Sequence, residues 1–104
     1  MTCHIIISGF VQGVGYRQFV KKTALSLDLK GWVKNLPRRQ AGIDGGRVET
    51  LFSGSKEAIE KAIKACRKGP FLAEVKDIRI EWKEPFDFAQ GKKEPDFQSF
   101  EIII

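Results

Sequence analysis

The spacing of apolar residues divides the chain into segments with two periods, one typical of strands and one typical of helices. Residues 3–9 are rich in β-branched side chains and end at a glycine, which predicts a buried strand. Apolar residues recur at helical spacing between residues 16 and 27, with lysines between them, so we expect an amphipathic helix there. Residues 32–36 and 46–53 predict a second and a third strand.

The second half of the chain continues with a helix and two strands. Ser55 is a suitable N-cap, and the apolar stripe that follows it predicts a helix that ends at Gly69 and Pro70. Residues 75–83 alternate between apolar and charged side chains, as in a strand with one buried and one solvated face. Residues 97–104 predict the last strand.

This order of elements predicts an α+β fold. It is βαββαβ with an extra C-terminal strand, which fits a ferredoxin-like split-βαβ sandwich: an antiparallel sheet of four to five strands with both helices on one face. No linker or repeat divides the sequence, so we expect residues 1–104 to form a single domain. Residues 37–46 and 84–96 are long for such a fold and rich in turn-forming residues, so we expect extended loops there. Arg38 and Arg39 in the first loop either attract an anionic substrate or are solvated charges.

Charge and cysteine content limit the class of protein only loosely. Lys and Arg outnumber Asp and Glu by 18 to 13, and the net charge of +5 suits a phosphorylated metabolite and a nucleic acid equally. Cys3 and Cys66 lie far apart, and the chain shows no signal peptide and no apolar run near transmembrane length. We therefore expect a reduced, cytoplasmic protein in which both thiols fill the core. His4 has no partner at ligand spacing, so we expect no metal site and an ordinary hydrogen bond for this strand residue.

The segment between the first strand and the first helix has the composition of an anion-binding loop. It reads Gly-Phe-Val-Gln-Gly-Val-Gly-Tyr-Arg over residues 9–17. Glycines let several backbone N–H groups turn toward one point, and the start of a helix adds unpaired N–H groups and a partial positive charge. Arg17 offers a planar, charged fork to two oxygens of the anion. The alternative is that the glycines only form a tight turn and Arg17 is solvated.

Two motifs of the chain resemble those of the acylphosphatase family. Residues 9–17 match the signature Gly-x-Val-Gln-Gly-Val-x-aromatic-Arg, with Tyr16 where phenylalanine is usual. Residues 31–37 match Gly-aromatic-Val-x-Asn-Leu-Pro, and Asp-Gly and Val-Glu follow in the family's order. The resemblance covers the whole chain apart from the two long loops. It implies an enzyme that hydrolyses acyl phosphates to a carboxylate and inorganic phosphate.

The resemblance also assigns site residues. It implies phosphate binding by Arg17 and by the loop before it, namely Val11, Gln12, Gly13, Val14, Gly15 and Tyr16. It implies a catalytic, water-positioning role for Asn35, whose amide can hold a water in line with phosphorus without acting as a base. On the residues alone, the favoured role of Asn35 is to start the turn before Pro37, and the match to the family's motif reverses that preference. For the ring of Tyr16 we expect packing at the helix start.

These groups favour one kind of substrate. A site of one arginine, backbone amides and one asparagine contains no general acid, general base, nucleophile or metal, so it stabilises phosphoryl charge and orients water. An alkoxide leaving from a phosphate monoester would need an acid, whereas a carboxylate does not, because the pKa of its conjugate acid is about 4. The site therefore selects a carboxyl-phosphate anhydride, and no cofactor is expected.

The expected partners are an acyl phosphate and inorganic phosphate, the latter as product and inhibitor. We expect a monomer that binds neither nucleic acid nor a membrane. One alternative is a ferredoxin-like module for nucleic acid, but residues 46–52 lack the aromatic pairs that would stack bases and include Glu49. The other is a non-catalytic or carbamoyl-phosphate-handling domain of the same family, which would rely on a partner for further chemistry.

Overall fold

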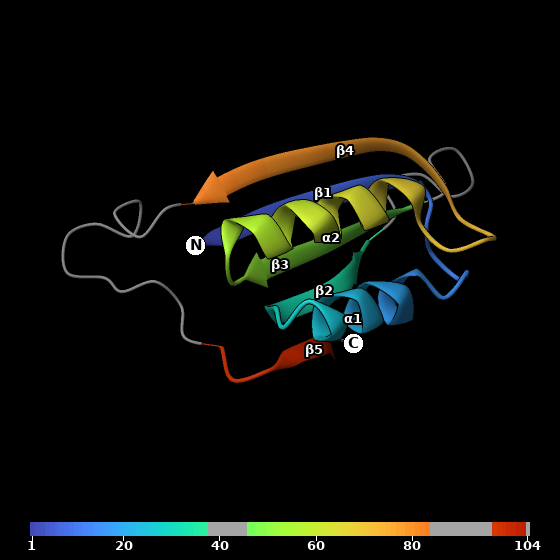
Figure 1. Cartoon of the computed structure of the whole chain (residues 1–104). Coiled ribbons are helices and arrows are strands. Elements are labelled where there is room, and N and C mark those ends of the chain that lie inside the picture. The colour runs from blue at the N-terminus through green and yellow to red at the C-terminus, as the bar shows by residue number, and fades with distance from the viewer. Residues whose placement is uncertain (38–45, 84–96, 104) are drawn as a thin grey trace.

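The computed structural model describes residues 1–37, 46–83 and 97–103. Its elements are β1 (Thr2–Phe10), α1 (Tyr16–Ser26), β2 (Lys30–Leu36), β3 (Arg47–Ser53), α2 (Lys56–Lys68), β4 (Glu74–Lys83) and β5 (Phe100–Ile103), as Figure 1 shows. Each predicted strand and helix is present, with ends that differ by a few residues. The two predicted long loops, with Arg38 and Arg39, fall on residues 38–45 and 84–96, outside the described residues.

The five strands form one sheet in the order β4-β1-β3-β2-β5. Strand β1 pairs antiparallel with β3 and β4, and β3 pairs antiparallel with β2. Strand β5 instead runs parallel to β2, with Phe100 opposite Gly31, so the sheet is mixed and only its first four strands have the expected antiparallel arrangement. The chain leaves β4 and enters β5 at the same end of the sheet, which makes β5 antiparallel to β4 and therefore parallel to β2.

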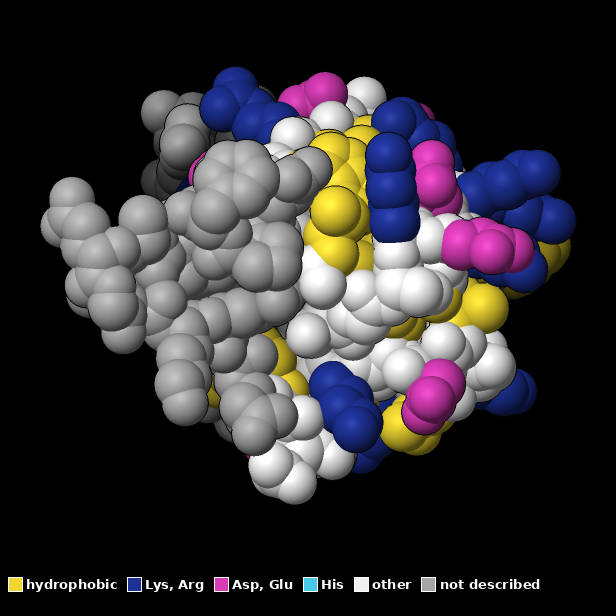
Figure 2. All heavy atoms as spheres, turned by 60° about the vertical axis from the view of Figure 1, so that its left-hand side comes forward, with side chains coloured by type: hydrophobic (Ala, Val, Ile, Leu, Met, Phe, Trp, Pro, Cys, Tyr) yellow, Lys and Arg dark blue, Asp and Glu magenta, His cyan; other side chains and the backbone are white. Residues whose placement is uncertain are grey.

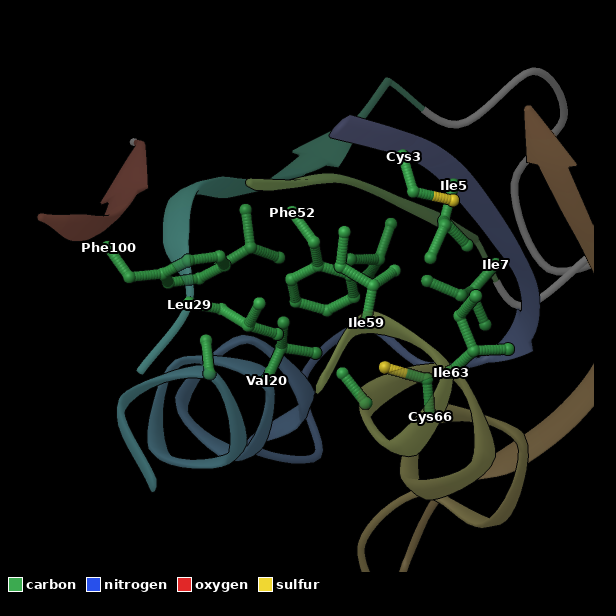
Figure 3. Close-up of a cluster of buried hydrophobic side chains, with 14 of the residues drawn as sticks. Cys3, Ile5, Ile7, Val20, Leu29, Phe52, Ile59, Ile63, Cys66 and Phe100 are labelled. Carbon is green, nitrogen blue, oxygen red and sulfur yellow. The ribbon is translucent and has the colours of Figure 1, made fainter. Parts of the chain in front are cut away.

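Both helices cover one face of the sheet, as predicted, and the hydrophobic core lies between this face and the helices (Figures 1 and 3). The rings of Phe52 and Phe100 stack with centroids 5.7 Å apart, which ties β5 to the centre of the sheet. The thiols of Cys3 and Cys66 are free and fully buried in this core, as expected of apolar fillers. Burial raises the pKa of each thiol to about 12, so both stay neutral and unreactive at physiological pH.

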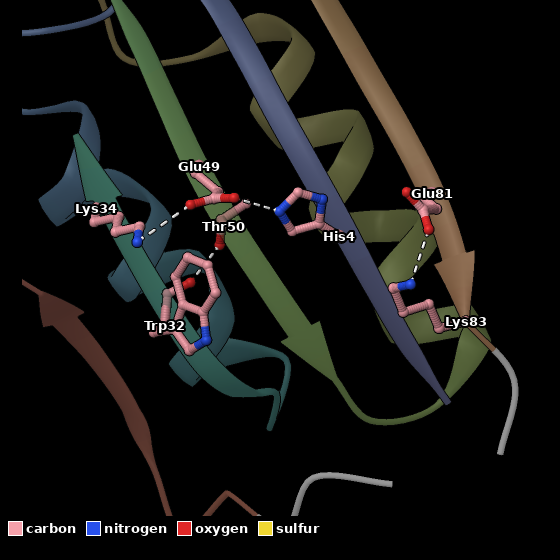
Figure 4. A network of polar contacts seen from close by, with 7 residues as sticks. All are labelled: His4, Trp32, Lys34, Glu49, Thr50, Glu81 and Lys83. Carbon is pink, nitrogen blue, oxygen red and sulfur yellow. Dashed lines mark hydrogen bonds and ion pairs between the residues drawn. The ribbon is translucent and has the colours of Figure 1, made fainter. Parts of the chain in front are cut away.

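The opposite face of the sheet is polar (Figure 4). His4 Nε2 lies 2.6 Å from Glu49 Oε2, which confirms that His4 is a strand residue with a hydrogen bond. Lys34 Nζ lies 3.4 Å from the other Glu49 oxygen and 5.2 Å from the ring centroid of Trp32. These contacts cross β1, β3 and β2 and hold the strands in register.

Basic and acidic side chains lie near one another on one face of the molecule (Figure 2). On the face shown in Figure 2, Lys and Arg side chains lie around the molecule with Asp and Glu between several of them. Of the helices that the structure describes, none is long and apolar enough to cross a membrane.

Candidate active site

Two segments that are distant in sequence meet at one end of the sheet. Strands β1 and β2 end there, and residues 11–15 lead from β1 into α1; we call residues 11–16 the anion loop. A pocket of about 190 Å³ lies between this loop, the start of α1 and the end of β2. Its lining residues are Val11, Gly13, Gly15, Tyr16, Arg17, Gln18, Asn35 and Ile102.

The anion loop depends on two left-handed glycines. The φ angle is 76° at Gly13 and 78° at Gly15, a region that residues with a Cβ rarely adopt. An added Cβ at either position would meet no atom within 4 Å, so the backbone angle and not crowding requires glycine. Left-handed residues alternating with ordinary ones turn neighbouring N–H groups toward a common point, which is how backbone loops bind anions.

The beginning of α1 has no cap from its own chain. Gly15 occupies the N-cap position without a side-chain hydrogen bond, and the first turn contains no acidic residue. Helix α2 differs, because Ser55 Oγ accepts a hydrogen bond from Ala58 N at 3.1 Å and Glu57 lies in the first turn. The first N–H groups of α1 and the positive end of its dipole are therefore left for an external anion.

Arg17 and Asn35 both line the pocket. Arg17, in the first turn of α1, is half-buried and has no carboxylate partner in the described part of the chain. On β2, Asn35 Oδ1 is buried and no described group donates a hydrogen bond to it. An unpaired buried acceptor is costly, so this oxygen is suited to a water or a substrate donor in the pocket.

A model of the acylphosphatase family matches residues 3–102 of the chain. The chain belongs to the acylphosphatase family. An acylphosphatase from Trichormus variabilis is 42% identical over 82 residues, which cover 79% of this chain and 74% of that protein. The crystal structure of an acylphosphatase from Bacillus subtilis has a TM-score of 0.74 and 33% identity, with 99% of this chain and 98% of that chain covered.

A second solved acylphosphatase, from Coxiella burnetii, has a TM-score of 0.78 and 31% identity, with 98% of this chain and 90% of that chain covered. The predicted family, the ferredoxin-like fold and the enzyme class are thereby confirmed. The family assignment favours neither of the two alternatives, a nucleic-acid-binding module or a non-catalytic or carbamoyl-phosphate-handling domain.

Two residues of the anion loop, Gln12 and Val14, do not line the pocket. Gln12 Nε2 donates to the carbonyl oxygens of Leu36, at 2.8 Å, and Arg47, at 2.9 Å. A Cβ at Gly46 would lie only 2.7 Å from Gln12 Cδ, so a glycine leaves room for this amide. The side chain of Gln12 thus joins the anion loop to the strand end that carries Asn35. Val14 packs against the core.

Tyr16 contributes to the pocket wall, but its hydroxyl points elsewhere. The ring is 1% exposed, and the hydroxyl donates to the Cys66 carbonyl oxygen at 2.6 Å. Four residues after Cys66 comes Pro70, which has no N–H to offer this carbonyl. The tyrosine hydroxyl replaces that donor, which gives the departure from the family's phenylalanine a structural role. Burial raises the pKa of Tyr16 above its usual range, so the hydroxyl stays protonated.

Sequence reasoning missed two lining residues, Gln18 and Ile102. Gln18 follows Arg17 in the first turn of α1, directly after the family's motif, and this adjacency was the only available signal. Ile102 enters the pocket because β5 pairs with β2 opposite Val33, two residues from Asn35. No local pattern in the sequence indicates which strand β5 joins.

Proposed function

We propose that the family's reaction, hydrolysis of the carboxyl-phosphate bond of acyl phosphates, takes place in this pocket without a metal ion. Arg17 and the backbone amides of the anion loop would hold the phosphoryl oxygens, and Asn35 would orient the attacking water. The observation that carries the proposal is that a buried, unpaired Asn35 oxygen shares one pocket with the uncapped start of α1 and with Arg17. This arrangement would place a site for the attacking water beside a site for the phosphoryl group.

The reaction then needs no proton donor from the protein. A lone pair of the water attacks phosphorus while the bond from phosphorus to the acyl oxygen breaks, and the carboxylate leaves with that electron pair. The water proton passes to an oxygen of the substrate's own phosphoryl group. Arg17 and the loop amides would stabilise the charge on the equatorial oxygens.

None of the described residues that line the pocket has a His, Cys, Asp or Glu side chain to offer a metal ion. Within the described ranges, no group of three or more His, Cys, Asp or Glu side chains is placed to hold a metal ion. The proposal extends to inorganic phosphate as a competitive inhibitor, to a single domain over residues 1–104 and to a monomer. A cytoplasmic location is supported by the two free thiols in the core.

The test is hydrolysis of benzoyl phosphate by the purified protein, with phenyl phosphate as the monoester control and both assays repeated in EDTA. We expect rapid turnover of the acyl phosphate, competitive inhibition by millimolar phosphate, no turnover of the monoester and no effect of EDTA. A loss of activity in EDTA that a divalent ion restores would refute the metal-free mechanism. Comparable turnover of the monoester would show that the site supplies a general acid, which the proposed mechanism does not contain.

A further inference from the structure

The turn between α2 and β4 exposes two large apolar side chains. Phe71 is 99% exposed and Leu72 is 71% exposed. The Ala73 N–H donates to the Pro70 carbonyl at 3.0 Å, which closes a turn with these two residues at its corners. Ala73 packs against the core and so fixes the turn. Turn corners usually carry polar residues or glycine, and side chains that bury almost nothing here do not stabilise the fold.

This turn lies beside the anion loop. A Cβ added at Gly69 would lie 3.1 Å from Cε2 of Tyr16, so the turn begins against the first residue of α1. Phe10, which is 44% exposed, immediately precedes the anion loop and pairs with Glu74 at the start of β4. Figure 1 shows the turn and the anion loop at the same end of the sheet. We call Phe10, Phe71 and Leu72 the apolar rim.

The strand order places the apolar rim and Asn35 on different sides of the sheet's central strand, β3. Asn35 lies on β2, near the β5 edge, whereas Phe10 ends β1 and the turn leads into β4 at the other edge. In a displacement at phosphorus, the attacking water and the leaving oxygen lie on opposite sides of the phosphorus atom. A water held by Asn35 therefore directs the leaving carboxylate away from β2, toward the side of β1 and β4.

We infer that the apolar rim contacts the acyl group of the substrate and that the enzyme prefers acyl phosphates with a sizeable apolar chain or ring to acetyl phosphate. This inference rests on the proposed function, because Asn35 sets the direction of the leaving group. Removing about 60 Å² of apolar surface from water raises affinity about tenfold. The turn is held by its own hydrogen bond, so contact requires no ordering of the protein.

The experiment compares kcat/KM for octanoyl phosphate and acetyl phosphate in three proteins: the wild type, the double variant Phe71→Ser with Leu72→Ser, and Leu25→Ser. Leu25 is a matched control, since it is 57% exposed but lies near the end of α1, about 13 Å along the helix axis from its start. We expect the wild type to favour octanoyl phosphate, the double variant to lower that preference about tenfold, and Leu25→Ser to leave it within about twofold.

Acetyl phosphate turnover and inhibition by inorganic phosphate should stay unchanged in both variants, which also shows that they are folded. Equal use of both substrates by the wild type, or a preference that survives in the double variant, would overturn the inference. So would a changed binding to phosphatidylserine vesicles with an unchanged substrate preference, which would assign the rim to a membrane surface. Failure of the proposed function looks different, because the wild type would then hydrolyse neither substrate.

Discussion

Arg17 and Asn35 share a pocket but differ in what they bind. The guanidinium of Arg17 has a charge and a planar set of donors for phosphoryl oxygens, which are present in the substrate, the transition state and the product. The unpaired Asn35 oxygen suits a neutral donor such as the attacking water. A complex with inorganic phosphate does not involve this attack, so Asn35 should contribute little to phosphate affinity. Substitution of the two residues should therefore give two different kinds of kinetic defect.

Arg17→Gln should weaken the binding of inorganic phosphate and also lower turnover, because the fork is lost from ground state and transition state alike. Arg17→Lys should not restore either property, since a point charge cannot reproduce two parallel hydrogen bonds. Calorimetric titration with phosphate, together with turnover of benzoyl phosphate and a circular dichroism spectrum, measures this. Wild-type phosphate affinity in a folded Arg17→Gln protein would place the anion elsewhere.

Asn35→Ala should leave phosphate affinity within about threefold of the wild type while turnover falls by about two powers of ten, the loss expected for one well-placed orienting group. The same titration and assay apply, with Arg17→Gln as the comparison. If the alanine variant keeps normal turnover, or loses as much phosphate affinity as the arginine variant, then Asn35 does not position the water.

The two helices differ at their beginnings, and sequence predicts this difference in part. Ser55 is recognisable as an N-cap because its hydroxyl suits the first N–H groups of α2, and the glycines of residues 9–17 mark an uncapped start for α1. Sequence does not show that Gln12 reaches the ends of β2 and β3, because that contact depends on how distant segments meet. The role of Gly13 and Gly15 in a tightly turning loop was predictable from the sequence, whereas the hydrogen bonds by which the Gln12 side chain holds that loop were not.

Gly15→Val should weaken phosphate binding at least tenfold, because a β-branched residue strongly disfavours the left-handed angle at this N-cap. Gly15→Asn should retain more affinity, since asparagine tolerates that region best among residues with a Cβ. Ser55→Ala is the matched control at the other helix: it should cost about 1 kcal/mol of stability and leave phosphate binding unchanged. Phosphate titration and urea unfolding of all three variants distinguish the two roles. Equal phosphate affinity in the valine and asparagine variants would contradict the backbone argument.

At the scale of the whole molecule, the sequence predicted which faces of the helices and strands are buried, but it did not predict which strands are neighbours at the edge of the sheet. The alternation of apolar and polar residues in β4 and the apolar stripes of α1 and α2 reflect which side of each element is buried, so the sequence indicated these buried faces. The parallel pairing of β5 and the nearness of the Phe71 turn to the anion loop depend on the path of the chain between elements, which leaves no local periodicity. The buried thiols of Cys3 and Cys66 also act on the molecule as a whole, through its stability.

Stability should fall as pH rises above 9. Each thiol has a pKa of about 12 in the folded protein against an ordinary value of 9.0, so above pH 9 the unfolded chain loses protons that the folded chain keeps. The stabilisation is complete below pH 9 and is lost toward pH 12, at up to about 1.4 kcal/mol per pH unit for each thiol. Urea unfolding of the wild type and of Cys66→Ala from pH 7 to pH 10 measures this. The free energy of unfolding of Cys66→Ala should fall less steeply with pH than that of the wild type. Identical slopes would mean that the Cys66 thiol does not contribute to the pH dependence of stability.

The parallel pairing of β5 with β2 has a consequence for the time course of folding. The anion loop, Arg17 and Asn35 all belong to the first half of the chain, but the wall that Ile102 supplies arrives from the last strand. Pairing between such distant segments is slow, because a large loop must close before the contacts form. We therefore expect refolding chains to recover sheet structure first and catalytic turnover afterwards, so that regained activity marks the docking of the final strand.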